Sequence, residues 1–405
     1  MWKKIKQFYY QLSPFKIIAG YYLLTVLIAT LLLSLPGMQQ PGVPYSFMDT
    51  LFTAFSAVSV TGLTTVNINE IYTTTGIVIL MIILQIGGIG IMALGTFLWV
   101  FTKRRISLKQ RQLIMTDQNQ HRLSGLVRML KQIIIIFFLI EIVGAIVLGC
   151  YFLSYFPTWQ EAFLNGLFIS VSATTNAGFD LTGASLQPFS HDYFVQIVNM
   201  ILIFSGAIGF PVLIEVKDIV KKRLKKEKAH FSLFTKLTTW TYIILFIAGA
   251  ILFIIFESRG FLQGKAWHES LFYGLFQSIS TRSSGLTTLD VTLLTDETLL
   301  VLALLMFIGA SPSSVGGGIR TTTFALNILF LYNFSRGRRS IQLFHREIHD
   351  EDLLKSFVVT LFAVMICFVS VLLLSVSEEQ LLLAIIFEVC SAFGTSGMSM
   401  GITPE

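Results

Sequence analysis

The sequence predicts an all-α membrane protein in which four repeats, each a span, a pore loop and a second span, surround a central pore. Three observations support this prediction. Of the 405 residues, 54% are hydrophobic and only 13% are charged, about half the charged share of a soluble domain. Several apolar runs exceed the roughly 18 residues that indicate a membrane-spanning helix. Four similar glycine-containing loops recur at intervals of about 110 residues, which indicates an internal repeat.

Lysine and arginine residues gather in four clusters between the apolar stretches: residues 3–16, 103–131, 217–236 and 336–355. Because short loops rich in these residues stay in the cytoplasm, we expect the clusters and the N-terminus to be cytoplasmic in a multi-pass plasma-membrane protein. The clusters then contact lipid headgroups or, alternatively, dock a cytoplasmic partner. Binding of nucleic acid is not expected, because the basic loops lack interleaved aromatic residues on a soluble fold.

The elements of the first two repeats follow from their apolar runs and glycines. Repeat 1 (1–105) contains a span over 15–35, a short helix over 47–60, a loop around Gly62 and a span over 76–101. Its first span is too long for a signal peptide and lacks a cleavage pattern. Repeat 2 (106–228) contains a span over 133–156, a short helix over 160–173, a loop around Gly178 and a span over 194–216. We interpret the glycines at 87–90 and 206–209 as small interruptions for close helix packing.

The last two repeats have the same order of elements. Repeat 3 (229–345) contains a span over 237–256, a short helix over 268–280, a loop around Gly285 and a span over 299–331. Repeat 4 (346–405) contains a span over 357–376, a short helix over 381–392 and a loop around Gly397, after which the sequence stops. This fourth repeat is therefore incomplete, because its second span is missing.

The glycine loops are candidates for an ion-selectivity filter. A helix of about 12 residues is only some 18 Å long, so the short helices enter the membrane without crossing it. Non-helical backbone at that depth is tolerated where it lines a cavity. Glycine lets the loop turn its carbonyls inward, and rings of carbonyls can replace the hydration shell of a monovalent cation, with potassium favoured. The predicted filter comprises Val60, Thr61, Gly62, Asn176, Ala177, Gly178, Ser283, Ser284, Gly285, Thr395, Ser396 and Gly397.

The second span of repeat 3 is interrupted midway. Pro312 removes a helix N–H and clashes with the preceding turn, and Arg320 places a charge inside the membrane. We expect the helix to break beneath the filter and the break to act as a gate, the alternative being a passive kink. The predicted gate comprises Gly309, Ala310, Ser311, Pro312, Ser313, Ser314, Val315, Gly316, Gly317, Gly318 and Arg320.

Two further charges lie in apolar surroundings. Arg282, inside the third loop, could offset the charge of filter carbonyls or limit ion occupancy. The alternative, which we favour, is a salt bridge with an acid such as Glu388 or Asp290. Glu141 lies in the middle of a span, and whether it faces the pore or a structural partner stays open. The three cysteines are far apart and predict neither a disulfide nor a metal site.

The four loops, the run 309–320 and the run 393–404 resemble the Ktr/Trk/HKT superfamily of potassium transporters, most closely the membrane subunit (B or D type) of bacterial Ktr systems. The resemblance covers almost the whole chain. It implies filter glycines at the four positions above, a gating intramembrane loop at 309–318, a homodimer with one pore per subunit, and a cytoplasmic nucleotide-binding regulatory ring. It implies no cofactor in this chain beyond potassium as the permeating ion, and leaves open whether sodium couples to or activates transport.

Glycine in all four loops fits the potassium-selective members of that superfamily, whereas serine in the first loop accompanies sodium transport in some plant relatives. One departure is that family members carry a second span, with an arginine directed toward the pore, after the fourth loop. We therefore expect the sequence to be incomplete at its end.

Two other functions compete with this prediction. A sodium-selective or mixed sodium/potassium conductor of the same architecture differs only in its filter. An intramembrane serine protease is suggested by Gly394–Thr395–Ser396–Gly397, but a nucleophilic serine needs a general base within reach. No histidine follows Ser396, and His345 and His349 lie in a basic cytoplasmic cluster, so we do not expect an enzyme.

Overall fold

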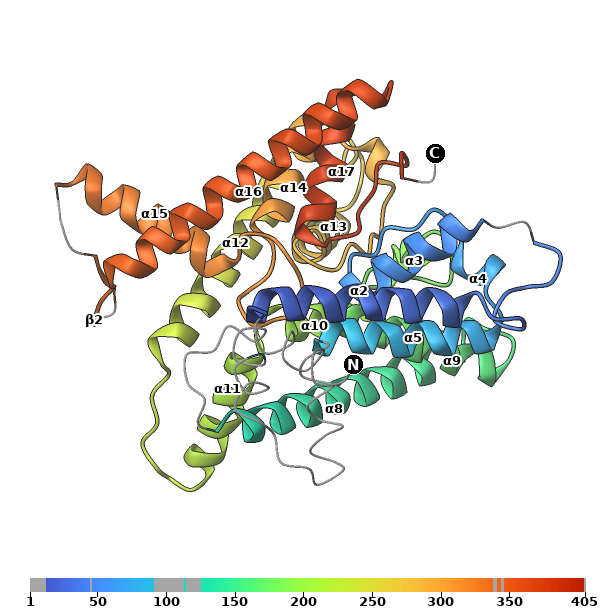
Figure 1. The fold of residues 1–405 in the computed structure, drawn as a ribbon, viewed down its shortest axis with the longest axis horizontal. Coiled ribbons are helices and arrows are strands. Elements are labelled where there is room, and N and C mark those ends of the chain that lie inside the picture. The colour runs from blue at the N-terminus through green and yellow to red at the C-terminus, as the bar shows by residue number, and fades with distance from the viewer. Residues whose placement is uncertain are drawn as a thin grey trace.

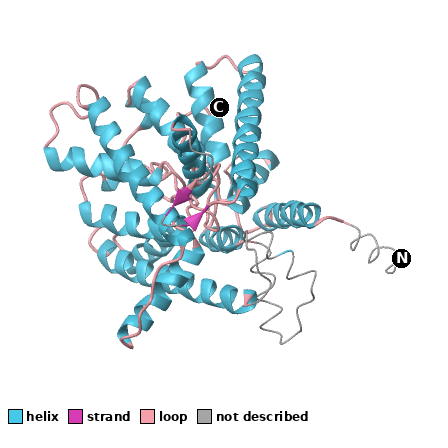
Figure 2. Ribbon diagram, turned by 90° about the vertical axis from the view of Figure 1, so that its left-hand side faces the viewer, coloured by secondary structure: helices cyan, strands magenta, loops and turns pink. Residues whose placement is uncertain are grey.

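A computed structural model describes residues 12–43, 46–90, 113, 125–337, 341–343 and 346–403. The described chain is almost entirely helical, as Figure 2 shows. We refer to the four predicted repeats as units 1 to 4. The predicted end of the second span of unit 1, most of the basic cluster 103–131 and the N-terminal lysines lie outside the described residues.

Four helices in the described part of the chain are long and apolar enough to cross a membrane, and each is the first span of one unit. They are α2 (Pro14–Leu33), α8 (Leu126–Phe152), α12 (Leu233–Glu257) and α16 (Asp350–Ser377). Large apolar side chains on all four are exposed, as is usual for surfaces that face lipid tails. The prediction of these four spans is confirmed.

A short helix follows each of these spans: α3 (Phe47–Ser59), α9 (Trp159–Thr174), α13 (Trp267–Ser280) and α17 (Leu382–Gly394). Polar side chains cap the first two, because the first N–H groups of a helix lack partners within it. The hydroxyl of Ser46 accepts from Asp49 N, and that of Thr158 accepts from Glu161 N. Each short helix ends where its glycine loop begins, so its C-terminal dipole end points into the loop.

The second spans of units 2 and 3 are interrupted, and that of unit 2 is bent more sharply than the sequence analysis predicted. In unit 3, α14 (Asp296–Ile308) and α15 (Thr321–Ser335) flank the expected break. In unit 2, the interruption predicted at 206–209 is not small but a sharp bend, because α10 (Tyr193–Ala207) and α11 (Phe210–Leu224) are bent by 103°. In unit 1, α5 (Thr74–Ile89) ends at Gly90. Gly90 and Gly209 have φ values of 92° and 103°, which favour glycine and end a helix.

Several small elements were not predicted from the sequence. They are α4 (Ile68–Ile71), the 3₁₀ turns η1 (Gln187–Phe189) and η2 (Val291–Leu293), and a two-stranded antiparallel ribbon of β1 (Gln342–Leu343) and β2 (Arg346–Glu347). The ribbon lies between α15 and α16. In Figure 1 the start of α16, which falls within the predicted cluster 336–355, and the basic connection from α11 to α12 lie on the same side of the molecule.

Helix packing repeats from unit to unit. Each short helix packs against the first span of its own unit: α3 on α2, α9 on α8, α13 on α12 and α17 on α16. The second span then packs on the short helix of the next unit: α5 on α9, α10 on α13 and α14 on α17. Three apolar core clusters accordingly join unit 1 to 2, unit 2 to 3 and unit 3 to 4. This serial packing brings the four glycine loops together.

Glycines allow the closest of these contacts, as the sequence analysis predicted for units 1 and 2. A Cβ at Gly87 would lie 2.6 Å from the Val58 carbonyl oxygen, and one at Gly206 would lie 2.0 Å from the Thr174 carbonyl oxygen. Both carbonyl groups belong to the last turn of a short helix. The second spans therefore press directly against the short helices, just before the glycine loops begin.

Candidate functional site

The four loop glycines all adopt backbone conformations that favour glycine. The φ values are 92° at Gly62, 72° at Gly178, 70° at Gly285 and 86° at Gly397. Side chains at such angles are strained. The backbone geometry therefore agrees with the prediction that these four positions require glycine.

The loops contact one another in a closed cycle. A Cβ added at Gly62 would lie 2.4 Å from the carbonyl oxygen of Ala177 in loop 2, and one at Gly178 would lie 2.4 Å from that of Ser284 in loop 3. A Cβ at Gly285 would lie 2.0 Å from the Ser396 oxygen in loop 4, and one at Gly397 would lie 2.3 Å from the Thr61 oxygen in loop 1. Each glycine thus makes room for the carbonyl of the residue that precedes the next glycine in the cycle.

Loops 1, 2 and 4 share one backbone pattern. The N–H groups of Thr61, Ala177 and Ser396 each donate to the carbonyl five residues earlier, a bond that closes the end of a helix. The residue before each of these, Val60, Asn176 or Thr395, has a positive φ of 56°, 51° or 48°. Each of these three loops therefore contains one strained, left-handed residue that is not glycine.

Loop 3 is one residue shorter between its helix and its glycine. Here Gly285 itself donates to the carbonyl five residues earlier, and no left-handed residue precedes it. The hydroxyl of Ser280 donates to Leu286 O, as that of Ser172 donates to Phe179 O in loop 2. Ser280 therefore matches Ser172, and loop 3 corresponds position by position to the other loops only from its glycine onward.

Side-chain hydrogen bonds join three of the loops. Ser283 Oγ of loop 3 bonds Asn176 Oδ1 of loop 2 at 3.1 Å, and Ser396 Oγ of loop 4 donates to the Thr281 carbonyl at 2.8 Å. Ser396 is fully buried. Its hydroxyl is thus engaged with a backbone carbonyl rather than a general base, which agrees with the rejection of a protease from the sequence.

Two cavities border the glycine loops, one lined by residues at and after the glycines and the other by residues before them; we call the first the outer cavity and the second the inner cavity. The outer cavity, about 220 Å³, is lined by Gly62, Gly178, Asp180 and the segment 64–68. The inner cavity, about 240 Å³, is lined by Val60, Thr395, Tyr22, and residues of the interrupted second spans, including Gly88, Gly90, Phe210, residues 314–317 and Arg320.

The break between α14 and α15 forms a folded-back loop at the inner cavity. At its base, Ala310 N donates to Gly317 O at 3.3 Å and Arg320 N donates to Ile308 O at 2.9 Å. Its tip is bound to unit 2, because Ser311 N and Val315 N donate to the Ala207 and Gly206 carbonyls. Its return strand is bound to unit 4, because Gly317 N and Gly318 N donate to the Gly394 and Phe393 carbonyls.

The intramembrane charges have mostly backbone and amide partners. Arg282 forms no salt bridge with Glu388 or Asp290, so the favoured prediction is wrong; its guanidinium donates to the carbonyls of Tyr242 and Gly309. Glu388 instead accepts from Ser399, Met400 and Thr403. Glu141 accepts from Gln85 Nε2 on α5, which gives it a structural partner. Arg320 donates to the Ser311 carbonyl within the break.

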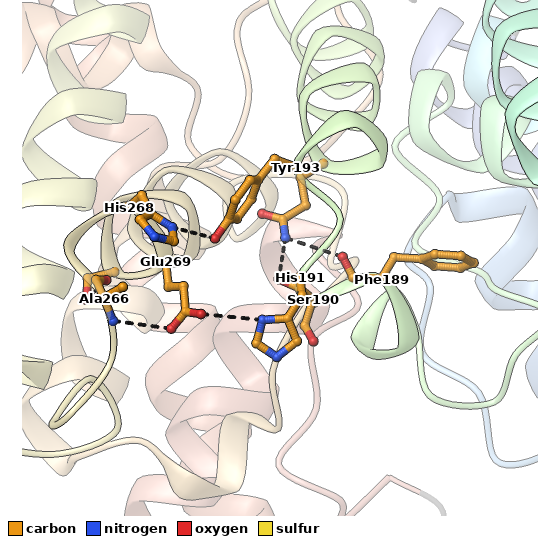
Figure 3. Close-up of polar contacts among 9 residues, drawn as sticks. Phe189, Ser190, His191, Tyr193, Ala266, His268 and Glu269 are labelled. Carbon is orange, nitrogen blue, oxygen red and sulfur yellow. Dashed lines mark hydrogen bonds and ion pairs between the residues drawn. The ribbon is translucent and has the colours of Figure 1, made fainter.

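Polar contacts also join units 2 and 3 near the start of α10 and α13, as Figure 3 shows. Tyr193 Oη and His268 Nδ1 are 2.7 Å apart, and His191 Nδ1 lies 3.7 Å from Glu269 Oε1. Glu269 Oε2 accepts from Ala266 N at the first turn of α13. These contacts hold the third short helix against its neighbour at the end opposite its glycine loop.

Some residues of the site have no signal in the sequence of the loops themselves. Gly206 and Ala207 offer the carbonyls that bind the break, and Tyr242 offers another to Arg282. Every residue has a carbonyl, so acceptors of this kind leave no mark in a sequence. Of Gly206 and Ala207, only the glycine could be singled out in the sequence, and only by its place in the repeat.

The chain resembles known transport proteins over nearly its whole length. The family model of TrkH, described as cation transport protein, matches residues 4–405. The Ktr system potassium uptake protein D of Bacillus subtilis is 54% identical over 97% of this chain and 87% of its own. The Ktr system potassium uptake protein B of the same organism is 33% identical, and the potassium/sodium uptake protein NtpJ of Enterococcus hirae is 32% identical, each over 87% of its length.

A solved structure has the same fold. The crystal structure of the potassium transporter TrkH from Vibrio parahaemolyticus superposes with a TM-score of 0.71 and 16% identity, covering 95% of this chain and 77% of that one. Since the family model spans residues 4–405 and several relatives exceed 30% identity over most of their lengths, the chain belongs to the TrkH family of cation transport proteins.

Proposed function

We propose that this protein is the potassium-translocating membrane subunit of a Ktr-type uptake system, and not an enzyme. The observation that carries the proposal is the closed cycle of four glycine loops, in which each glycine admits the carbonyl of the next loop. Carbonyl oxygens gathered around one axis can replace the water shell of a potassium ion. The 54% identity to a Ktr potassium uptake protein supports the same ion.

In this proposal four span–loop–span repeats surround one central pore. The filter consists of the twelve loop residues predicted from the sequence, and the two cavities above and below it form the ends of the ion path. The short helices add their negative dipole ends, which favour a cation at the axis. The serial packing of second spans on the next unit supports the arrangement.

A second candidate is transport of sodium as well as potassium. The 32% identity to a relative named as a potassium/sodium uptake protein favours it. Purified protein in liposomes, loaded with potassium or sodium and followed by an ion-sensitive dye, distinguishes the two. We expect potassium flux to exceed sodium flux by about tenfold or more. Equal fluxes would support the mixed transporter, and absence of any cation flux would overturn both.

We further propose that the break over 309–318, with Arg320, is the gate. It borders the inner cavity beneath the glycine cycle and is bound on one side to unit 2 and on the other to unit 4. Because the segment is held by separate sets of backbone hydrogen bonds to two neighbours, release of one set while the other persists gives a second arrangement of the break. One would obstruct the path and the other would retract.

Removal of residues 311–317 tests the gate. The deletion shortens the obstruction without altering any filter loop, so potassium flux into liposomes should rise and depend less on a regulatory subunit. Selectivity should be nearly unchanged. A folded deletion protein with equal or lower flux would show that the break is a packing kink.

We also propose that the basic segments face the cytoplasm, where a nucleotide-binding ring docks, and that the subunit forms a homodimer with one pore in each copy. The basic end of α11 and the start of α16 lie on one side of the molecule (Figure 1), which agrees with a single cytoplasmic face. A cysteine introduced at Lys225, with the three native cysteines replaced, should react with an impermeant reagent only in inside-out vesicles. Reaction in intact cells would invert the orientation.

A further inference from the structure

Arg282 lies in the third glycine loop and is completely buried. Its guanidinium donates to the Tyr242 carbonyl on α12 and to the Gly309 carbonyl at the end of α14, both at 3.1 Å. The guanidinium carbon lies 3.9 Å from the centroid of the Tyr242 ring. None of the described carboxylates lies within 4.0 Å of it. Because an unpaired buried charge is costly, these carbonyls and the ring face are what hold it there.

The Gly309 carbonyl belongs to the base of the break. Gly309 packs so closely on the returning chain that a Cβ there would lie 2.2 Å from the Gly317 carbonyl oxygen. The next residue, Ala310, is hydrogen-bonded to the same oxygen. A movement of Gly309 therefore moves both ends of the folded-back segment. The side chain of Arg282 thus connects the third glycine loop to the base of the folded-back segment.

The residues at the same distance before the glycines of loops 1 and 2 make no such connection. The hydroxyls of Ser59 and Thr175, which are three residues before their glycines, donate to carbonyls of their own short helices. Loop 4 has Gly394 there, whose carbonyl accepts from Gly317 N at 3.2 Å. The break is thus attached to the loops at two points, by backbone in loop 4 and by a charged side chain in loop 3.

We propose that Arg282 is a positioning residue that couples the third filter loop to the gate, so that the ion held in the filter biases the arrangement of the break. The inference rests on the proposed filter and gate. An ion that changes the position of loop 3 displaces the guanidinium of Arg282. The hydrogen bond from the guanidinium to the Gly309 carbonyl transmits this displacement to the break. Coupling of this kind is reciprocal, so the arrangement of the break also alters the ion preference of the filter.

The chemistry requires arginine rather than any cation. A planar guanidinium can direct separate N–H groups at two carbonyls while its face lies on an aromatic ring. Lysine keeps the charge but has a single ammonium head, which cannot lie flat on Tyr242 and bridge the two oxygens in the same geometry. Arg282→Lys therefore separates loss of the connection from loss of the charge.

The test measures the gate while the ion in the filter is changed. Ser314 lines the inner cavity, so Ser314→Cys, in a protein with Cys150, Cys367 and Cys390 replaced, reports access from the cytoplasmic side. We expect the labelling rate by a water-soluble maleimide to differ by about fivefold or more between potassium and sodium, the lower end of usual coupling between sites. In Arg282→Lys the two rates should become equal within about twofold.

Tyr242→Phe is the matched control, because the hydroxyl of Tyr242 has no hydrogen-bond partner among the described residues and the ring face is kept. It should behave like the reference protein. Tyr242→Leu removes the ring face and retains the carbonyl, so it should reduce the ion dependence even if Arg282→Lys does not fold. Ion-dependent labelling that persists in Arg282→Lys and Tyr242→Leu, or labelling of the reference that ignores the ion, would overturn the coupling.

Potassium and sodium fluxes through the same liposomes keep this result separate from the proposed function. If the reference protein conducts potassium selectively but its labelling ignores the ion, the coupling is wrong and the filter stands. If it conducts no cation, the proposed function fails first, and the coupling falls with it.

Discussion

At the scale of single residues, Asp49 joins the first short helix to the chain beyond its glycine loop. Its carboxylate accepts from Ser46 N at 2.9 Å and from the Thr65 hydroxyl at 2.9 Å. The backbone N–H and the hydroxyl of Ser46, and then the Thr65 hydroxyl, hold the pKa of Asp49 below its usual range. The carboxylate therefore stabilises the folded protein above the ordinary aspartate pKa of about 4, and that stability is lost as the pH falls toward the lower folded pKa.

Asp49→Asn should lower the melting temperature of the purified protein at pH 7, and the difference from wild type should shrink between pH 5 and about 3. Thr65→Val removes one donor and should give a smaller effect of the same sign. The effects are modest because the carboxylate is partly exposed. A difference that stays constant with pH would mean that the charge of Asp49 does not contribute to the folded state.

Single residues also show where the sequence was sufficient. The loop glycines were predictable because only glycine adopts a positive φ without strain, and the repeat marked which glycines mattered. The partners of Arg282 were not predictable. A buried cation suggests a carboxylate partner, but here two main-chain carbonyls and an aromatic face take that role, and neither acceptor has a residue type that identifies it.

At the scale of elements, glycines decide how closely the short helices approach the spans. Gly166 of α9 faces Gly149 of α8, and a Cβ at Gly166 would lie 2.5 Å from the Gly149 nitrogen. Backbone atoms on both sides leave no flexible group that could move aside. By contrast, a Cβ at Gly20 of α2 would have no atom within 4 Å.

Gly166→Ala should therefore destabilise the protein by about 1–3 kcal/mol, because it overpacks a helix contact. Gly20→Ala should be neutral or stabilising by up to about 1 kcal/mol, because alanine is the better helix former. Thermal unfolding in one detergent, followed by intrinsic fluorescence, compares the two. Equal stability of both variants would show that the α8–α9 contact is looser than described.

The elements themselves were largely predictable, with one class of exceptions. The first spans and the short helices follow from the lengths of apolar runs, and their observed bounds differ from the predicted ones by at most seven residues. The bend of 103° at Gly209 was missed. A glycine in an apolar run predicts close packing as readily as a bend. The phenylalanine and proline that follow Gly209 begin a new helix, and Phe210 N donates to the Ser313 carbonyl of unit 3.

At the scale of the whole molecule, the order of the repeats in the sequence becomes a cycle of contacts in space. Packing of each second span on the next short helix carries the chain around from unit 1 to unit 4. The glycine of loop 4 then meets the carbonyl of loop 1 and closes the cycle. The sequence could predict four equivalent loops, but not that loop 3 is one residue shorter, because superposed glycines conceal a change in helix length.

The most direct test of the central claim is the selectivity of four glycine variants. Gly62→Ser, Gly178→Ser, Gly285→Ser and Gly397→Ser each place a Cβ within 2.4 Å of a neighbouring loop's carbonyl oxygen. Gly42→Ser is the matched control, since Gly42 has a φ of 85° with no atom within 4 Å of the added Cβ. The measurement is the ratio of potassium to sodium flux in proteoliposomes.

We expect the ratio to fall by about tenfold in each of the four filter variants, because the displaced carbonyl no longer completes the coordination of potassium. The ratio in Gly42→Ser should equal that of the wild type. An unchanged ratio in all four variants, with folding intact, would contradict the assignment of the glycine cycle as the selectivity filter.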